Sequence, residues 1–355
     1  MKNIYFTVGP SQVYPKLYKY LTQAMKEDIP SLNHRGAEFK LLFKNTTEGL
    51  RKLLNIPSSY KILFVSSALE GMERTVQGCV QKFSFHIVTG SFGKTWANYA
   101  SSLGKTILKS EIKTGEGIEL TKLDVPIESE LICITQNDTS SGVWFPMEDI
   151  YALQKKYPEK LIALDVVSSI PYVDIDYKFI DVTFFSVQKG FGLPAGLAVI
   201  IISPKTLAKT EALFKKDLNI GSYHSLKHLS EKAIYFQTPE TPNVLNIYLL
   251  NKVIKDMLKT NLKKIRSETD QKAKVLYNFF DSHKKYTSFI KNIKFRSPTT
   301  LVFEVKGESE TLRKKLAKKG FILGAGYGDN KLNHIRIANF PSHSLKNVKS
   351  MLKCI

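Results

Sequence analysis

Seven short β-rich runs alternate with amphipathic segments between residues 61 and 202, and this alternation restricts the fold more than any other feature of the sequence. Such runs, separated by helical patterns, are typical of βαβ units around a mostly parallel sheet. We therefore expect an α/β core. The predicted strands are residues 61–66, 85–90, 105–110, 130–136, 160–167, 182–187 and 196–202, and the predicted helices include Glu70–Gln81, Lys94–Leu103 and Met147–Lys156.

The rest of the chain predicts a smaller α+β unit. A long helical pattern runs from Thr241 to His283 and is weakest at Thr260-Asn261. Beyond it, residues 291–307 and 334–340 are expected to form strands, and residues 310–320 a helix that ends at Gly320.

A chain of 355 residues exceeds the usual size of one domain. We therefore expect a large domain over residues 16–258 and a small domain formed by residues 1–15 and 259–355.

Composition indicates a globular protein in a reducing compartment. The chain is 43% hydrophobic, which is enough for a large core. Its N-terminal residues lack the pattern of a secretion signal, and its longest apolar run, residues 196–202, is far shorter than a membrane span. Cys79, Cys133 and Cys354 are too widely spaced to indicate a disulfide framework or a zinc site. We expect a cytoplasmic protein without a membrane partner or a metal.

The formal charge of +20 suits either a nucleic-acid binder or an enzyme for anionic substrates. The lysines are spread over the whole chain, among apolar residues at helical spacing. We interpret them as a solvated basic surface and expect no nucleic-acid partner.

Polar residues follow the predicted strands at their carboxyl ends, where ligands bind in open parallel sheets. These residues are Ser66-Ser67-Ala68, Phe92, Asn137-Asp138-Thr139, Asp165 and Lys189.

Asp165 and Lys189 are separated by one predicted strand. Lys189 lies in the stretch SVQKGFGLPAG, between an apolar run and a loop of glycines and proline. A lysine that forms a Schiff base and an acid that faces a pyridine nitrogen are the two residues that a pyridoxal phosphate enzyme needs most. Taken alone, Asp165 would equally suit a helix cap or an ion pair.

At this point the chain resembles a known family, the fold-type I, class V aminotransferases, and within it most closely the phosphoserine aminotransferases. The resemblance covers nearly the whole chain and implies a large domain with a mostly parallel seven-stranded sheet between helices. Its segments, in chain order, are YFTVGPSQVYP, SLNHRGAEF, SSALEGME, VTGSFGKTW, ITQNDTSSGV, LDVVSSI, SVQKGFGLPAG, QTPETPNVLNIY and IRIANFP.

The resemblance implies roles for four residues around the ring of pyridoxal 5′-phosphate. Lys189 is expected to carry the cofactor and to act as the base that moves the substrate's proton, for which its pKa should be lowered. Asp165 would face the pyridine nitrogen and Thr139 the phenolic oxygen. Phe92 stands where phosphoserine aminotransferases usually have a tryptophan that stacks on the ring, and a phenyl ring can still stack.

The cofactor phosphate is expected on Ser67, Ala68 and Leu69, whose amides open a helix near Glu70. Relatives are glycine-rich here, and an ordinary N-capped helix is the alternative. Gln188 matches a further phosphate contact.

Other residues are expected to act from a second copy of the chain. The resemblance implies that Gln237 and Thr238 reach the cofactor phosphate from the neighbouring subunit, and so it implies a homodimer with shared active sites.

Three residues are candidates for substrate binding. Arg336 matches the arginine that binds the substrate's α-carboxylate, for which a planar fork is suited. His34 and Arg35 match a pair that binds the substrate's phosphate across the dimer interface, although the same pair occurs in relatives that act on other substrates.

The resemblance therefore implies a ping-pong aminotransferase that converts 3-phosphohydroxypyruvate and L-glutamate into O-phospho-L-serine and 2-oxoglutarate, a step of serine biosynthesis. The alternative with the same cofactor is an alanine-glyoxylate or serine-pyruvate aminotransferase, which Phe92 and the loop SSALEGME favour. An inactive anion- or nucleic-acid-binding protein on the same fold is the alternative from another class.

Overall fold

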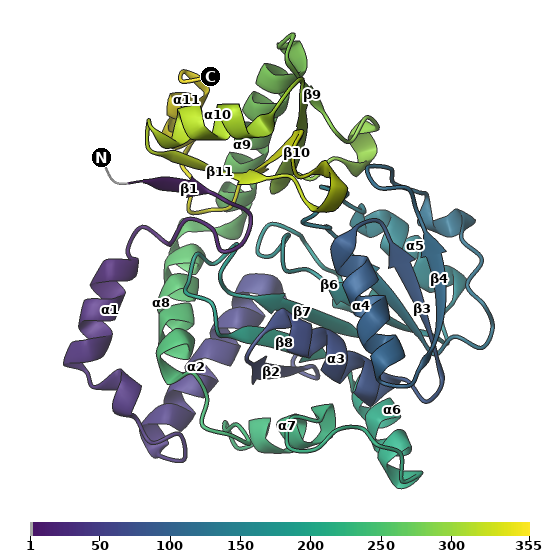
Figure 1. Ribbon diagram of the computed structural model, residues 1–355. Coiled ribbons are helices and arrows are strands. Elements are labelled where there is room, and N and C mark those ends of the chain that lie inside the picture. Colours follow the sequence, from purple (N-terminus) through teal and green to yellow (C-terminus); the bar gives the residue numbers. More distant parts are fainter. Residues whose placement is uncertain (1–2) are drawn as a thin grey trace.

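All seven runs predicted between residues 61 and 202 form strands of one sheet in the computed structural model, which describes residues 3–355 (Figure 1). The sheet order is β2-β8-β7-β6-β5-β3-β4, and only β8 runs antiparallel to its neighbours. The mostly parallel sheet is thus confirmed. Its strands are β2 (Lys61–Val65), β3 (Phe83–Val88), β4 (Thr106–Glu111), β5 (Leu131–Thr135), β6 (Leu161–Asp165), β7 (Val182–Ser186) and β8 (Ala198–Ile202).

The central strands are buried on both faces. Every residue of β5, β6, β7 and β8 is buried, which explains why these strands read as continuous apolar runs rather than as alternating patterns. The edge strand β4 is instead partly exposed and carries the charged residues Lys109 and Glu111.

Helices surround this sheet. Helices α3 and α4 pack directly on its strands, and α2 packs along α8. The helices are α1 (Leu17–Lys26), α2 (Ala37–Leu54), α3 (Ala68–Cys79), α4 (Ser91–Ser102), α5 (Met147–Lys156), α6 (Pro204–Lys215), α7 (Leu226–Ala233) and α8 (Val244–Thr260), with 3-10 turns η1 (Ile29–Ser31), η2 (Leu120–Lys122) and η3 (Tyr177–Phe179). The bounds predicted for α5 are confirmed, whereas α3 and α4 begin earlier than predicted.

The remaining elements build a second sheet in the order β1-β11-β12-β10-β9. Its first strand comes from the opposite end of the chain: β1 pairs in parallel with β11, so the N-terminal segment lies beside the C-terminal part (Figure 1). These elements are β1 (Ile4–Phe6), α9 (Leu262–Ser282), β9 (Tyr286–Ser288), η4 (Ile293–Phe295), β10 (Thr300–Val305), α10 (Ser309–Ala317), β11 (Phe321–Ala325), η5 (Gly328–Asn330), β12 (His334–Ala338) and α11 (Leu345–Leu352).

The long helical pattern is two helices that meet at its predicted weak point. Asn261 has φ +73°, ends α8, and caps α9 by accepting the amide of Lys263. The strand prediction was wrong for residues 293–295, which form a 3-10 turn because the side chain of Asn292 caps it.

Two hydrophobic cores accompany the two sheets. Helix α9 contributes to both, with Ile265 in the core of the larger sheet and Leu276 and Phe280 in the core of the smaller one. The domain division after residues 15 and 258 stays a prediction. No helix within residues 3–355 has the length and hydropathy to span a bilayer.

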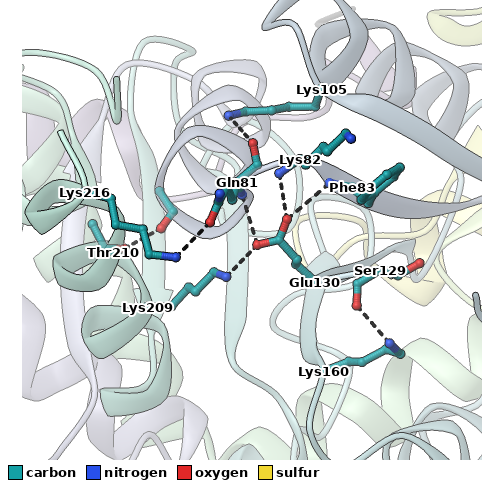
Figure 2. A network of polar contacts seen from close by, with 11 residues as sticks. Gln81, Lys82, Phe83, Lys105, Ser129, Glu130, Lys160, Lys209, Thr210 and Lys216 are labelled. Atoms are coloured by element: carbon teal, nitrogen blue, oxygen red, sulfur yellow. Dashed lines mark hydrogen bonds and ion pairs between the residues drawn. The ribbon is translucent and has the colours of Figure 1, made fainter. Parts of the chain in front are cut away.

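The carboxylate of Glu130, the residue before β5, joins the amino ends of β3 and β5 (Figure 2). Glu130 accepts the amides of Gln81 at 3.0 Å, Lys82 at 2.7 Å and Phe83 at 3.2 Å. It also pairs with Lys209 of α6 at 2.5 Å. Burial raises the pKa of Glu130, but Lys209 and the three amides outweigh it, so the pKa is lowered overall.

We expect Glu130→Ala to lower the free energy of unfolding by about 1–3 kcal/mol. The reason is that three backbone amides lose a charged hydrogen-bond acceptor, which water replaces only in part. Urea denaturation of both proteins with cofactor present measures this. Exposed Glu128, in the same loop, is the control, and Glu128→Ala should change stability by less than about 0.5 kcal/mol.

Because the pKa of folded Glu130 is lowered, its contribution is present above the ordinary carboxyl pKa and is lost as pH falls through the folded value. The difference between wild type and Glu130→Ala should therefore shrink below about pH 4. A difference that stays constant down to pH 3 would contradict this assignment.

Candidate active site

The carboxyl ends of β5, β6 and β7 open into a cavity of about 380 Å³. This volume lies within the range of about 300–1,000 Å³ that is usual for small-ligand sites. The predicted site residues that line it are Ser67, Ala68, Leu69, Phe92, Thr139, Asp165, Gln188, Lys189 and Arg336. Residues that are far apart in the sequence thus meet at the sheet edge where ligands of parallel sheets bind.

Lys189 is the most buried cation of this cavity. Its side-chain amine donates to Thr139 Oγ1 at 2.8 Å and to Ser168 Oγ at 2.9 Å, and the residue is 6% exposed. Burial lowers the pKa of Lys189, and the charge of Asp165 only partly opposes this. A lysine with a lowered pKa can act as a nucleophile and as a base near neutral pH.

Close packing and backbone conformation require the two glycines that follow Lys189. A Cβ on Gly190 would lie 1.9 Å from the carbonyl oxygen of Ile170, and Gly192 has φ +62°. Only glycine fits at both positions. The chain can therefore turn sharply after β7 and leave the Lys189 side chain in the cavity.

Asp165 ends β6 and is 4% exposed. Its Oδ1 accepts the amide of Val167 at 3.0 Å. Burial raises the pKa of Asp165, while the Val167 amide and Lys189 act in the opposite direction. A buried carboxyl of this kind suits a cationic ring nitrogen as partner.

Arg336 connects the two units of the protein at the cavity. It lies on β12, its Nε donates to the carbonyl of Ala325 at 2.7 Å, and its Nη1 donates to the carbonyl of Thr139 at 3.1 Å. Its guanidinium also lies 5.2 Å from the ring centre of Tyr327. The guanidinium group is thus held in place at the cavity wall, as bidentate binding of a carboxylate requires.

Phe92 is positioned by Asp138. The Asp138 carboxylate is buried and accepts the amides of Phe92 at 3.2 Å and Gly93 at 3.3 Å, at the start of α4. Its other oxygen accepts the amide of Ser140 at 2.8 Å. The ring of Phe92 lies 5.4 Å from the Lys189 amine, so an aromatic face borders the cavity.

Three residues of the site have no role that is predicted from the sequence: Asp138, Ser168 and Tyr327. Asp138 was visible only as one of several polar residues at a strand end. Ser168 lies three residues after Asp165, in a loop where no pattern marks it. Tyr327 comes from the loop after β11, in the other unit, and only the tertiary structure brings it to the cavity.

The helix next to the cavity begins two residues earlier than predicted. Ser67 is the N-cap of α3, and its hydroxyl accepts the amide of Glu70. The amide of Ala68 is already bonded to Ser186 Oγ at 2.8 Å. The loop is therefore an N-capped helix start that also lines the cavity, and its amides and dipole still favour an anion there.

Gln188 offers a further polar contact. Its Oε1 is buried and has no hydrogen-bond partner among residues 3–355. An unpaired buried amide beside a cavity is costly unless a ligand satisfies it.

The other predicted residues lie outside this cavity and close to one another. Arg35 donates to the carbonyls of Thr238 at 2.8 Å and Pro239 at 2.9 Å, and to Gln237 Oε1 at 3.4 Å. His34 precedes Arg35 and is partly buried. These four predicted residues, His34, Arg35, Gln237 and Thr238, therefore do not contact the Lys189 of their own chain.

The residues of the cavity fit pyridoxal phosphate. Lys189 offers a buried amine for the aldehyde, Asp165 a carboxyl for the ring nitrogen and Thr139 a hydroxyl for the phenolic oxygen. The start of α3 provides backbone amides for a phosphate group, and Gln188, which lines the cavity, can donate through its Nε2. Within residues 3–355 no cluster of three or more His, Cys, Asp or Glu side chains suits a metal ion.

Comparison with known proteins agrees with this site. The family model described as aminotransferase class-V matches residues 7–341. The phosphoserine aminotransferase of Corynebacterium glutamicum (strain R) is 25% identical over 355 residues, which covers 99% of this chain and 93% of that protein. A crystal structure of a phosphoserine aminotransferase from Cytophaga hutchinsonii is 43% identical, covers 99% of this chain and 98% of that chain, and has a TM-score of 0.97.

More distant structures share the fold. An alanine-glyoxylate aminotransferase from Nostoc sp. is 16% identical, with a TM-score of 0.83 over all of this chain and 94% of that one. At this identity the likeness concerns the fold alone.

We expect Lys189→Ala to prevent covalent attachment of pyridoxal phosphate. After borohydride treatment, mass spectrometry should find the cofactor's mass added to wild type and absent from the variant, because no other buried amine lines this cavity in residues 3–355. Lys94→Ala, which removes an exposed lysine near the site, should keep the label. Equal labelling of Lys189→Ala and wild type would remove Lys189 from its proposed role.

Proposed function

Since this chain belongs to the class V aminotransferases, we propose that it transfers the amino group of L-glutamate to 3-phosphohydroxypyruvate, and so forms O-phospho-L-serine and 2-oxoglutarate. The observation that carries this proposal is the full-length likeness to the phosphoserine aminotransferase structure from Cytophaga hutchinsonii. The substrates of an aminotransferase are small amino and keto acids. Each proposed substrate and product carries two anionic groups. Arg336 and the pair His34-Arg35 would bind them.

Enzymes of this family use pyridoxal phosphate. The cofactor supplies an electrophilic carbon that binds amino groups and a ring that accepts electrons from the substrate carbanion. Lys189, Asp165 and Thr139 would hold its ring, Phe92 would cover one face of it, and the start of α3 would hold its phosphate.

The chain's own residues would do the proton transfer and the orientation. The Lys189 amine, whose pKa is lowered by burial, would take the proton from Cα of the amino donor and pass it to the cofactor's carbon, and in the second half-reaction it would move a proton in the opposite direction, to Cα of the new amino acid. Thr139 and Ser168 lie within hydrogen-bond distance and orient this amine. Arg336 fixes the α-carboxylate so that the Cα proton faces Lys189.

We infer further that His34, Arg35, Gln237 and Thr238 act in the site of a second copy. They form one cluster that lies away from their own Lys189, although their types suit phosphate groups. Large exposed apolar side chains occur close to these residues in the sequence: Leu41 is 59% exposed and Tyr235 is 66% exposed. Large apolar side chains that gather on a surface mark an interface, which supports a homodimer with shared active sites.

A second candidate keeps the cofactor and changes the substrate. Phe92 stands where phosphoserine aminotransferases usually have tryptophan, and this favours an alanine-glyoxylate or serine-pyruvate aminotransferase. An inactive anion-binding protein is less well supported, because Lys189 and Asp165 lie in one cavity with Arg336 at its wall.

We expect kcat/KM for O-phospho-L-serine to exceed that for L-serine or L-alanine by about 100-fold or more, since a phosphate bound by an arginine fork and an imidazole contributes several charge-assisted hydrogen bonds. A substrate panel on the purified protein measures this. Higher values for serine or alanine would favour the second candidate.

Arg35→Ala should remove this preference and leave the slow reactions with serine and alanine unchanged. Arg35→Lys should restore it only in part, because lysine keeps the charge and loses the fork. Arg35 also binds the carbonyls of Thr238 and Pro239, so the bound cofactor must be quantified by its visible absorbance. If Arg35→Ala slows phosphorylated and unphosphorylated substrates equally, the phosphate role is wrong.

Mixing two variants that are each defective with phosphoserine tests the shared site. Lys189→Ala and Arg35→Ala, unfolded and refolded together, should regain about one quarter of the wild-type activity with phosphoserine, because half of the random dimers then contain one complete site. Each variant alone and a mixture of separately refolded proteins are the controls. No recovery in mixed dimers of confirmed composition would mean that Arg35 serves its own chain.

A further inference from the structure

A histidine outside the cavity bridges two acidic residues from distant segments. His224 lies between Glu70 of α3 and Glu240 of the loop before α8. Its Nδ1 is hydrogen-bonded to Glu70 Oε1, and its Nε2 lies 2.9 Å from Glu240 Oε2 in an ion pair that is poorly aligned for a hydrogen bond. The side chains of His224 and Glu70 are only 12% and 15% exposed. We call this contact the Glu70–His224–Glu240 bridge.

One end of the bridge orders the loop that precedes α3. Glu70 Oε2 accepts the amide of Ser66 at 2.8 Å and its hydroxyl at 2.7 Å, while the amide of Glu70 donates to Ser67 Oγ. Ser67 and Ala68, directly between these contacts, line the cavity. The conformation of the cavity wall thus depends on where the Glu70 carboxylate is held.

The other end orders the segment that carries Gln237 and Thr238. The hydroxyl of Thr238 donates to the carbonyl of Glu240 at 2.8 Å. Arg35 donates to the carbonyls of Thr238 and Pro239 in the same segment. The bridge therefore links the two segments to which phosphate binding is assigned.

The bridge depends on the charge of the imidazole. Burial lowers the pKa of His224, but the close contacts with the carboxylates of Glu240 and Glu70 and their charges outweigh it and raise the pKa to about 9. Burial raises the pKa of Glu70, but the hydrogen bonds from His224 and Ser66 and the charge of His224 outweigh this and lower the pKa of that carboxyl. His224 is thus a cation at neutral pH.

Other groups face the bridge from each neighbouring element. The ring of Tyr223, in the loop before α7, lies 4.1 Å from that of His224. In the loop before α2, His34 lies close enough for the charge of Glu240 to act on its pKa, and Arg35 donates to the carbonyl of Pro239, the residue before Glu240. Arg74 of α3 lies near Gly221 in the loop that carries His224.

An uncompensated Glu70 would oppose phosphate binding. A carboxylate at the start of α3 occupies the positive end of the helix dipole and repels a second anion nearby. The cationic His224 cancels this charge and also turns the carboxylate toward Ser66. The segment SSALEGME is not glycine-rich, so contacts made by its side chains must fix its shape.

We propose that His224 is a positioning residue for the cofactor: by bridging Glu70 and Glu240 it holds the loop before α3 in the conformation that receives the phosphate group. This inference rests on the cofactor site and is independent of which amino acid the enzyme uses. The bridge is complete while His224 is protonated and is lost as pH rises through the pKa of about 9.

The test measures binding of pyridoxamine 5′-phosphate to the cofactor-free protein, because this compound carries the phosphate but makes no bond to Lys189. His224→Gln should weaken its binding at pH 8 by about 10-fold, the effect of losing one charge-assisted contact. His228→Gln is the matched control, since His228 lies on α7, is 39% exposed and, within residues 3–355, pairs with Glu231 alone. It should bind like wild type.

The pH dependence separates positioning from general damage. Between pH 8 and pH 10 the wild-type affinity should fall toward that of His224→Gln, whose own affinity changes only through groups common to both proteins. A 10-fold difference that persists at pH 10, or none at pH 8, overturns the proposal. Circular dichroism of both variants verifies that they are folded.

Hydrogen exchange of the cofactor-free protein gives a readout without any ligand. Peptides that contain residues 66–70 or 237–240 should exchange faster in His224→Gln than in wild type or His228→Gln. All other peptides should exchange at the same rate in the three proteins. Unchanged exchange in both segments would contradict the proposal. Failure of the substrate assignment alone would leave these measurements unaffected.

Discussion

Everything in this site depends on holding one lysine amine out of water at the edge of a sheet. Lys189 has no carboxylate in ion-pair contact among residues 3–355, and its amine is bound by the hydroxyls of Thr139 and Ser168 instead. Neutral partners offset less of the cost of burial than an ion pair does, so the pKa of the amine is lowered. A direct carboxylate partner would keep the amine charged and unreactive. The distance between Asp165 and Lys189 is therefore as important to the chemistry as their presence.

Much of this arrangement could be predicted from the sequence, because parallel central strands are apolar throughout and because glycines and proline follow Lys189. The sheet, the two strand-end residues Asp165 and Lys189, and the break at Asn261 all follow from local patterns. Strand β1 could not be predicted in the same way. It has three residues, and its partner β11 lies more than 300 positions away in the chain. Its pairing depends on tertiary structure, which a local pattern does not contain.

The same limit applies to the residues that orient the reactive groups. Ser168 and Asp138 bind the Lys189 amine and the Phe92 amide through contacts that span 21 and 46 positions. Serine and aspartate are common in loops, so their types carry little information there. The reactive residues are recognisable because their chemistry is unusual at a strand end. The residues that position them are ordinary until their partners are known.

If the loop before α3 binds the cofactor phosphate as proposed, it meets a common function with different chemistry. A glycine-rich loop lets the backbone approach a phosphate closely, whereas SSALEGME has side chains that must be directed away. Glu70 is directed toward Ser66 by its own hydrogen bonds, and the cation of His224 compensates the charge that this brings to the helix start. In this proposal, side-chain contacts rather than glycines fix the loop. The loop then depends on a residue more than 150 positions away, and on the protonation of that residue.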